Sequence, residues 1–378
     1  MNLSDFTSGL YRKGNQYSFF IPEKINHNWV ISESRIQKKL ESASFQLGEL
    51  NSFSKFIPNI DLFIQSYVMK EAVTSSRIEG TKTNIEEAFN DEEEILPEKK
   101  DDWSETLQYQ KSLNFALEEL KNTPLSSRLF TGIHKILLDN VRGEKKTPGE
   151  FRRSQNWIGG ASLADATFIP PHQDYLPDLL SDLEKFIHNE EDFIPHLIKI
   201  AIIHYQFETI HPFLDGNGRT GRLIIPLYLV DKKILEKPLL YISDFFERNK
   251  SLYYDNLNFV REKNDMTQWI LFFLEGVEQT AKKAVNSLKS ILDLKDDILN
   301  NRISTLGRKI QNAQILLDFL FKNPVISAKK ISKNLEISSR TSNDLIANFL
   351  ELGILKEITG NKRNRVFSFI EYIEILKK

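Results

Sequence analysis

The chain has 378 residues, of which 40% are hydrophobic and 27% charged, with a formal net charge of −2 and no cysteine. These values are typical of a globular protein of two or three domains and argue against a general attraction to nucleic acid or membranes. Disulfides, thiol nucleophiles and cysteine-ligated zinc are excluded. The first residues lack a secretory signal pattern, and no apolar run reaches the ~18 residues of a membrane span. We therefore expect a cytoplasmic protein with no membrane partner.

The first part of the chain, residues 1–100, is predicted to be an N-terminal helical region. Apolar residues at helical spacing predict one helix near 34–53 and a clearer one over 61–80. The last turn of the second helix carries Ser75 and Glu79, which are four residues apart and share a face. By itself such a pair is usually just an exposed polar face without a function.

The middle part, residues 101–300, is predicted to be a second, mostly helical unit. Its helices are expected over 103–138 in two pieces, 176–188, 195–211, 219–230, 241–246, 249–260, 266–277 and 280–300. Before residue 176, two β-capable pieces at 156–158 and 167–169 flank a turn of small residues and predict a small β-hairpin. This hairpin is either a surface loop or a flap that holds an extended peptide by strand addition.

The last part, residues 301–378, differs in charge, with 14 Lys/Arg and 7 Asp/Glu. Its local net charge of +7 leaves −9 for the preceding 300 residues. Three predicted helices followed by two short strands with a basic connection have the outline of a winged helix. Residues that could contact DNA are Ser338, Ser339, Arg340, Thr341, Asn343, Lys362, Arg363 and Arg365. Winged helices also bind proteins, so the choice between DNA and protein stays open.

Residues 211–222 combine a base, a carboxylate, glycines and two arginines in twelve positions. His211 can move a proton near neutral pH, and Asp215 is the hard oxygen ligand that Mg²⁺ prefers. The glycines precede a predicted apolar helix, where free N–H groups and the helix dipole form an anion site. The two arginines lie three residues apart on one helical face and suit phosphate oxygens. The stretch therefore predicts nucleotide phosphate chemistry.

Two other interpretations of this region are weaker. Residues 216–221 match the G-x-G-x-x-G pattern of dinucleotide-binding folds, but a helix with His211 precedes them where those folds require a buried strand. His204 has no neighbouring chemistry and is predicted to be structural. No histidine pair has the spacing of a zinc-protease helix, which makes a transition-metal site improbable.

The whole stretch resembles the motif of the Fic (filamentation induced by cyclic AMP) family, H-x-F-x-(D/E)-G-N-G-R-x-x-R. The matching residues are His211, Phe213, Asp215, Gly216, Asn217, Gly218, Arg219 and Arg222. The resemblance covers roughly residues 60–280. It implies a mainly α protein with a Fic-type helical core and a small β-hairpin flap, to which the C-terminal winged-helix domain is added.

The resemblance implies AMP transfer from ATP to a Tyr, Ser or Thr hydroxyl of a protein, with Mg²⁺ as cofactor. His211 is then the catalytic base, Phe213 anchors the loop in the core, and Asp215 holds the metal. The residues expected to bind ATP are Glu79, Gly216, Asn217, Gly218, Arg219, Thr220, Gly221, Arg222 and Tyr254. Family members that act as kinases carry a bulky charged residue at the position of Gly218, so its absence favours attack at the α-phosphate.

Beside this motif, Ser75-x-x-x-Glu79-Gly80 resembles the inhibitory motif of the family, (S/T)-x-x-x-E-(G/N). The resemblance implies that Glu79 pairs with Arg222 and fills space that the γ-phosphate needs. Our leading hypothesis is therefore an adenylyltransferase inhibited by its own N-terminal helix.

Two alternatives stay open. At the same site, Glu79 could position a water that removes AMP from a modified protein, which would make the enzyme de-AMPylating or bifunctional. In a different class, the chain could be a DNA-binding regulator in which the nucleotide site only senses ATP. The sequence does not identify the target protein, which could be the chain itself, and it leaves a homodimer open.

Overall fold

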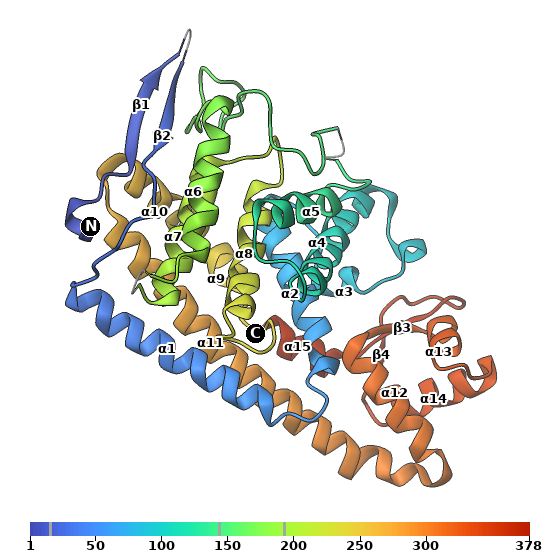
Figure 1. Cartoon of the computed structure of the whole chain (residues 1–378). Coiled ribbons are helices and arrows are strands. Elements are labelled where there is room, and N and C mark those ends of the chain that lie inside the picture. Colours follow the sequence, from blue (N-terminus) through green and yellow to red (C-terminus); the bar gives the residue numbers. More distant parts are fainter. Residues whose placement is uncertain (15–16, 143–144, 192–193) are drawn as a thin grey trace.

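The computed structural model describes residues 1–14, 17–142, 145–191 and 194–378, and these parts are mainly α-helical as predicted (Figure 1). Helices form the body, a small β-hairpin projects at one end, and the winged helix lies at the other. Within the described ranges, every helix is too short or too polar to cross a membrane.

The centre of the body is a pair of helices, α7 (His196–Ile210) and α8 (Asn217–Asp231). Every residue of α7 after its first is buried, because isoleucine, leucine and aromatic residues occur on all of its faces. Other helices surround the pair: α4 (Lys100–Glu119), α5 (Ser127–Leu137), α6 (Leu176–His188), α9 (Ser243–Arg248) and α10 (Lys250–Lys263). The loop between α7 and α8 therefore rests on a fully packed support.

A long helix pair covers one side of the body, with α1 (Ser34–Lys55) lying along α11 (Met266–Asp297) (Figure 1). Two helices, 266–277 and 280–300, were expected here, and that expectation was wrong, because α11 is continuous. The sequence that joins the two pieces contains neither glycine nor proline, so nothing interrupts the helical hydrogen bonds.

The helix α2 (Asp61–Ile78) connects the body with the winged helix (Figure 1). Its buried residues occur on all sides, and it contacts α4 and α9 of the body as well as α12 (Ile310–Lys322) of the C-terminal unit. Glu79 ends the helix, and Gly80 follows with a φ of +107°, a backbone conformation that favours glycine. The polar end of α2 is thus held against the centre of the body.

The small hairpin of the structure lies at the N-terminus, where β1 (Gly9–Lys13) pairs with β2 (Ser18–Pro22), and the sequence did not indicate it. The hairpin predicted over 156–169 is reduced to one antiparallel bridge between Ile158 and Phe168. The extended run stops there because two consecutive glycines, at 159 and 160, both take positive φ.

The C-terminal unit has the predicted winged-helix order of helices and strands: α12 (Ile310–Lys322), β3 (Val325–Ser327), α13 (Ala328–Asn334), α14 (Ser339–Glu351), β4 (Lys356–Glu357) and β5 (Val366–Ser368). The sheet order is β3-β5-β4, with both pairs antiparallel. Two elements were not predicted: the strand β3 and a last helix, α15 (Ile370–Lys377), which packs back on α11 and α2. The unit is therefore docked on the body through α12 and α15.

Candidate functional site

The loop between α7 and α8 is stabilised from within. α7 ends at His211, which takes a left-handed conformation with φ +49° and ψ +60°. The Asn217 amide then bridges the backbone of Phe213, accepting from its N–H and donating to its carbonyl, both at 2.8 Å. The Thr220 hydroxyl donates to the Gly216 carbonyl at 2.9 Å. These side chains hold the loop rather than face outward, so the anion site consists of backbone N–H groups at the start of α8.

His211 is held as a neutral base. Its Nδ1 lies 3.3 Å from the Glu208 carbonyl oxygen and donates to it, so that Nε2 is left as the proton acceptor. Burial, together with the positive charges of Arg152 and Arg261, lowers the pKa of His211 to about 3. The Arg152 guanidinium also donates to the His211 carbonyl at 2.9 Å. The imidazole is therefore unprotonated at neutral pH and can accept a proton.

A second histidine, which we did not single out from the sequence, supports the loop from below. The ring of His134 stacks on the Phe213 ring, with centroids 3.8 Å apart and planes within 6°. Its Nε2 donates to the Asp215 carbonyl at 3.0 Å, and its Nδ1 accepts from the Gly149 N–H at 2.9 Å. Burial lowers the pKa of His134 to about 4, so the ring keeps this neutral pattern. Phe213 is fully buried, in agreement with its predicted anchoring role.

The candidate metal ligand, Asp215, stands at the mouth of the site with 45% of its side chain exposed. One carboxylate oxygen accepts from the Gly216 N–H at 2.6 Å and lies 3.6 Å from Arg219. Elsewhere in the described ranges, no group of three or more His, Asp or Glu is arranged to hold a metal. A single exposed carboxylate fits Mg²⁺, which usually takes one or two protein carboxylates and completes its shell with phosphate oxygens and water.

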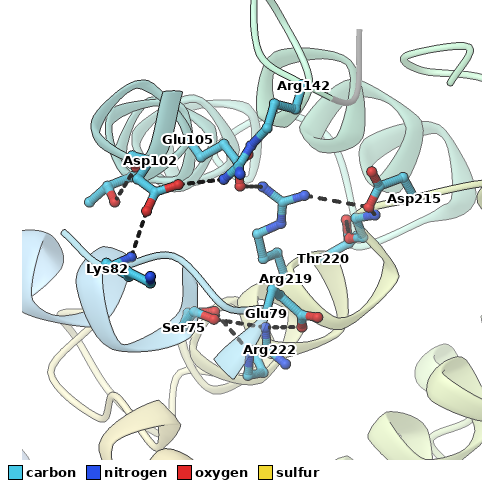
Figure 2. Close-up of polar contacts among 12 residues, drawn as sticks. Ser75, Glu79, Lys82, Asp102, Glu105, Arg142, Asp215, Arg219, Thr220 and Arg222 are labelled. Carbon is cyan, nitrogen blue, oxygen red and sulfur yellow. Dashed lines mark hydrogen bonds and ion pairs between the residues drawn. The ribbon is translucent and has the colours of Figure 1, made fainter. Parts of the chain in front are cut away.

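Arg219 lies in a chain of alternating charges that crosses from α8 to α4 (Figure 2). Its Nη1 is 3.1 Å from Glu105, whose other oxygen accepts from Arg142 at 2.7 Å. Arg142 in turn pairs with Asp102 at 2.5 Å. Only 5% of the Arg219 side chain is exposed, so Glu105 neutralises a buried charge. Nothing in the local sequence around Glu105 marks this role, because its partner is 114 residues away.

The second arginine of the motif, Arg222, is bound to the end of α2 (Figure 2). Its Nη2 donates to the Glu79 carboxylate at 2.6 Å and to the Ser75 carbonyl at 3.0 Å, and its Nε donates to the Ser75 hydroxyl at 2.8 Å. The Arg222 side chain is 1% exposed. Burial would raise the pKa of Glu79, but the charge and hydrogen bonds of Arg222 outweigh it and hold that pKa below its usual value. The structure thus brings together the two residues whose pairing the sequence implied.

Glu79 also lies directly over the start of α8. A Cβ atom placed on Gly218 would come within 2.3 Å of the Glu79 carboxylate and within 2.9 Å of Arg222. Such approaches are far closer than van der Waals contact. The Glu79 carboxylate therefore lies against Gly218 in the first turn of α8, close to the N–H groups where an anion would bind.

Three family models match the chain: the Fic/DOC family N-terminal model over residues 37–118, the Fic/DOC family model over 124–229, and an HTH DNA-binding domain over 314–370.

The chain belongs to the Fic/DOC family.

Among its relatives, the protein adenylyltransferase Fic of Culex quinquefasciatus is 32% identical over 161 residues, which are 42% of this chain and 29% of that protein. A probable protein adenylyltransferase of Aquifex aeolicus (strain VF5) is 28% identical over 176 residues, 47% of this chain and 52% of that protein. The match thus spans about half or less of these relatives. A Fic family protein from Desulfovibrio desulfuricans G20 shares the fold, with a TM-score of 0.58 at 18% identity over 89% of this chain and 96% of that one.

The remaining predicted residues of the Fic site, Gly221 and Tyr254, lie on α8 and α10. Gly221 leaves room for the Glu208 carboxylate, since an added Cβ would approach it to 2.2 Å. Tyr254 is 37% exposed, and burial together with the charge of Glu79 raises the pKa of its hydroxyl. His204, predicted to be structural, is buried between the Gly221 carbonyl at 3.0 Å and the Tyr253 hydroxyl at 2.8 Å.

Proposed function

We propose that the protein is an adenylyltransferase that moves AMP from ATP to a Tyr, Ser or Thr hydroxyl of a protein. The observation that supports this most is the arrangement at one loop. A neutral histidine base, the free N–H groups of a helix start, an exposed carboxylate and two buried arginines all converge there. Phosphoryl chemistry depends on such positioning and charge neutralisation more than on covalent catalysis by the protein.

In the proposed reaction the acceptor hydroxyl attacks the α-phosphorus of ATP, and its proton passes to Nε2 of His211. A bond forms between the acceptor oxygen and the α-phosphorus, and the bond from that phosphorus to the bridging oxygen of the β-phosphate breaks. Pyrophosphate leaves with the electron pair. The N–H groups of residues 217 and 218, joined by that of Gly216 once it parts from the Asp215 carboxylate, would stabilise the charge on the α-phosphate oxygens.

The cation site and the arginines would serve the leaving group. Asp215 would hold Mg²⁺, which would neutralise charge on the phosphates when bound. Arg219 and Arg222 would bind the β- and γ-phosphates with their guanidinium groups. Arg222 can do so only after it separates from Glu79, because two of its nitrogens are committed to α2.

We further propose that Glu79 inhibits the enzyme. Its carboxylate fills the space over Gly218 and neutralises Arg222. A triphosphate that enters the site would meet a like charge and would lack one of its two arginines. ATP would then be excluded or bound with its α-phosphate out of line for attack.

The test is incorporation of α-labelled AMP into the protein itself or into a lysate, with Mg²⁺ present. Glu79→Gly should raise incorporation about tenfold or more, a change that needs only about 1.4 kcal/mol of the barrier. Adding His211→Ala to Glu79→Gly should abolish the signal. A Glu79→Gly protein that binds ATP yet labels nothing would contradict the proposal. Loss of AMP from a pre-modified protein that depends on Glu79 would favour the de-AMPylating alternative.

We also propose that the winged helix binds duplex DNA. The first turn of α14 is exposed at Ser339, Arg340 and Asn343, and the connection between β4 and β5 is exposed throughout residues 359–365. A recognition helix of this kind enters the major groove by its first residues, while the basic wing contacts phosphates. This activity would accompany the transferase and does not compete with it as an explanation of the catalytic loop.

A further inference from the structure

The winged helix is packed directly on the helix that carries Glu79. The Phe63 ring of α2 meets the Phe321 ring of α12 edge to face, with centroids 5.1 Å apart. One turn later, the Ser66 hydroxyl donates to the Phe321 carbonyl at 2.9 Å in a buried setting. The first half of α2 therefore belongs to the interface with the C-terminal unit, while its last turn belongs to the catalytic site.

The segment that follows Glu79 is held by the same unit. It contains the short helix α3 (Ile85–Ala88). The apolar side of α3 packs in a buried cluster with residues from the sheet and the last helix of the C-terminal unit. The members of this cluster are Met69, Val73, Ile85, Ala88, Phe89, Val325, Val366 and Ile373. They come from α2, α3, the strands β3 and β5, and α15. The winged helix thus holds the chain on both sides of Glu79.

After α3 the chain forms an acidic turn, residues 91–94. This turn lies against Lys329 and Lys330 of α13. Lys330 donates to the Phe89 carbonyl at 3.0 Å and lies 3.3 Å from Asp91, and only 14% of its side chain is exposed. Lys329 pairs with Glu93 at 3.2 Å, with both side chains about 80% exposed. The less exposed pair, Lys330 with Asp91, contributes most to the contact, because a fully exposed pair adds little stability.

Few residues separate α3 from the inhibitory carboxylate. Five residues lie between Glu79 and α3, and their backbone is fixed at Thr81, which donates to the Ser76 carbonyl at 3.3 Å, and at Lys82, which donates to Asp102 at 2.7 Å. A displacement of α3 must therefore pull on the end of α2, because a chain this short has little slack.

We propose that the acidic turn 91–94 and a DNA backbone compete for Lys329 and Lys330 of α13, so that DNA binding to the winged helix loosens the segment that holds Glu79 on Arg222. This inference rests on the proposed transferase function and adds its regulation. Carboxylates and phosphates are alternative partners for the same ammonium groups. DNA can shift the equilibrium only through contacts that differ between the two states, and the exchange of partners at Lys329 and Lys330 supplies that difference.

Thermodynamic linkage requires that DNA binding and nucleotide binding affect each other by the same factor, so the proposal can be tested quantitatively. If DNA favours release of Glu79, then nucleotide that occupies the released site must strengthen DNA binding by the same factor. An effect of about 5-fold to 150-fold is the usual range for such coupling. The coupling is therefore measurable from either side of the molecule.

The first test uses charge variants of the full chain. Lys330→Glu should raise AMP incorporation at least about threefold without DNA, and Asp91→Lys in the same chain should reverse the rise by restoring the pair with opposite signs. The matched control is Lys333→Glu, an exposed lysine of α13 that, among the described residues, pairs with neither Asp91 nor Phe89. In the Glu79→Gly background, Lys330→Glu should not raise AMP incorporation further, because the contact between residue 79 and Arg222 is already lost.

The second test adds a 30-base-pair duplex DNA of random sequence to the unmodified chain. Hydrogen exchange over residues 75–94 should accelerate, and affinity for a fluorescent ATP analogue should rise, neither of which requires transfer of AMP. If the DNA binds and both quantities stay unchanged, or if no DNA binds, the proposal is overturned. If exchange and affinity respond but Glu79→Gly transfers no AMP, the coupling stands and the proposed transferase function fails.

Discussion

At the scale of single residues, the charged side chains of the site differ in their exposure to solvent. Asp215 meets solvent, whereas Arg219, Arg222 and Glu208 do not. The two arginines have carboxylate partners, but Oε1 of Glu208 has no hydrogen-bond partner in the described part of the chain. Burial raises the pKa of Glu208 to about 7. Glu208 is therefore a carboxyl group that the folded protein prefers to keep protonated.

Glu208→Gln should stabilise the protein at alkaline pH relative to acid pH. A raised carboxyl pKa means that the folded state binds the proton more tightly, so stability is full below about pH 4.5 and falls as pH rises through about 7. The loss is about 3 kcal/mol, and a glutamine at this position, which does not titrate, avoids it.

The measurement is urea denaturation of both proteins at pH 5 and pH 8. The advantage of the variant should be larger at pH 8 by about 2 kcal/mol. Glu71, whose pKa burial also raises to about 7, is present in both proteins and cancels in the comparison. An equal difference at the two pH values would show that Glu208 does not titrate with folding.

At the scale of elements, the charge chain between α4 and α8 holds the first turn of α8 against α4. Glu105→Ala would leave the Arg219 guanidinium buried beside only the more distant Asp215, and we expect a loss of roughly 3 kcal/mol. Arg142→Ala removes the exposed partner of the same carboxylate and should lose less than about 1 kcal/mol. Urea denaturation compares the two variants, and similar losses would argue against the buried pair as the stabilising contact.

The elements differ in how far sequence predicts them. The helix α6 follows from its apolar stripe, and α7 and α8 follow from their long runs of apolar residues. The N-terminal hairpin does not, since its pairing depends on contacts with distant parts such as the hydrogen bond from the Phe20 N–H to Ile169. The loop of residues 211–218 could be recognised from the sequence because its residues are consecutive. Glu105 and His134 could not, because only the fold brings them to the loop.

At the scale of the whole molecule, the net charge of −2 hides a division between an acidic body and a basic C-terminal unit. Part of that basic charge is neutralised against the body through Lys329, Lys330 and Lys377, whereas Arg363 and Arg365 are exposed and can meet a polyanion. The surface that faces outward is therefore the part of the unit best suited to DNA.

Binding of duplex DNA by the full chain should weaken steeply with salt. Each phosphate contact contributes about 0.9 to the slope of log affinity against log salt. Replacing Arg363 and Arg365 by alanine should lower the slope by about 1.8, whereas Lys121→Ala on the body should leave it unchanged. Fluorescence anisotropy over a salt series measures both. A slope that does not respond to the two arginines would place the DNA contact elsewhere.

The order of the residues along the chain has a consequence for synthesis. Glu79 precedes Arg222 by 143 residues, so a ribosome makes the carboxylate roughly 7 to 29 seconds before the arginine it will bind. The loop of residues 211–218 therefore emerges into a body where α2 is already present. The winged helix is made after both. On the proposed roles, a newly made molecule acquires its inhibitor first, its active site second and the unit that responds to DNA third.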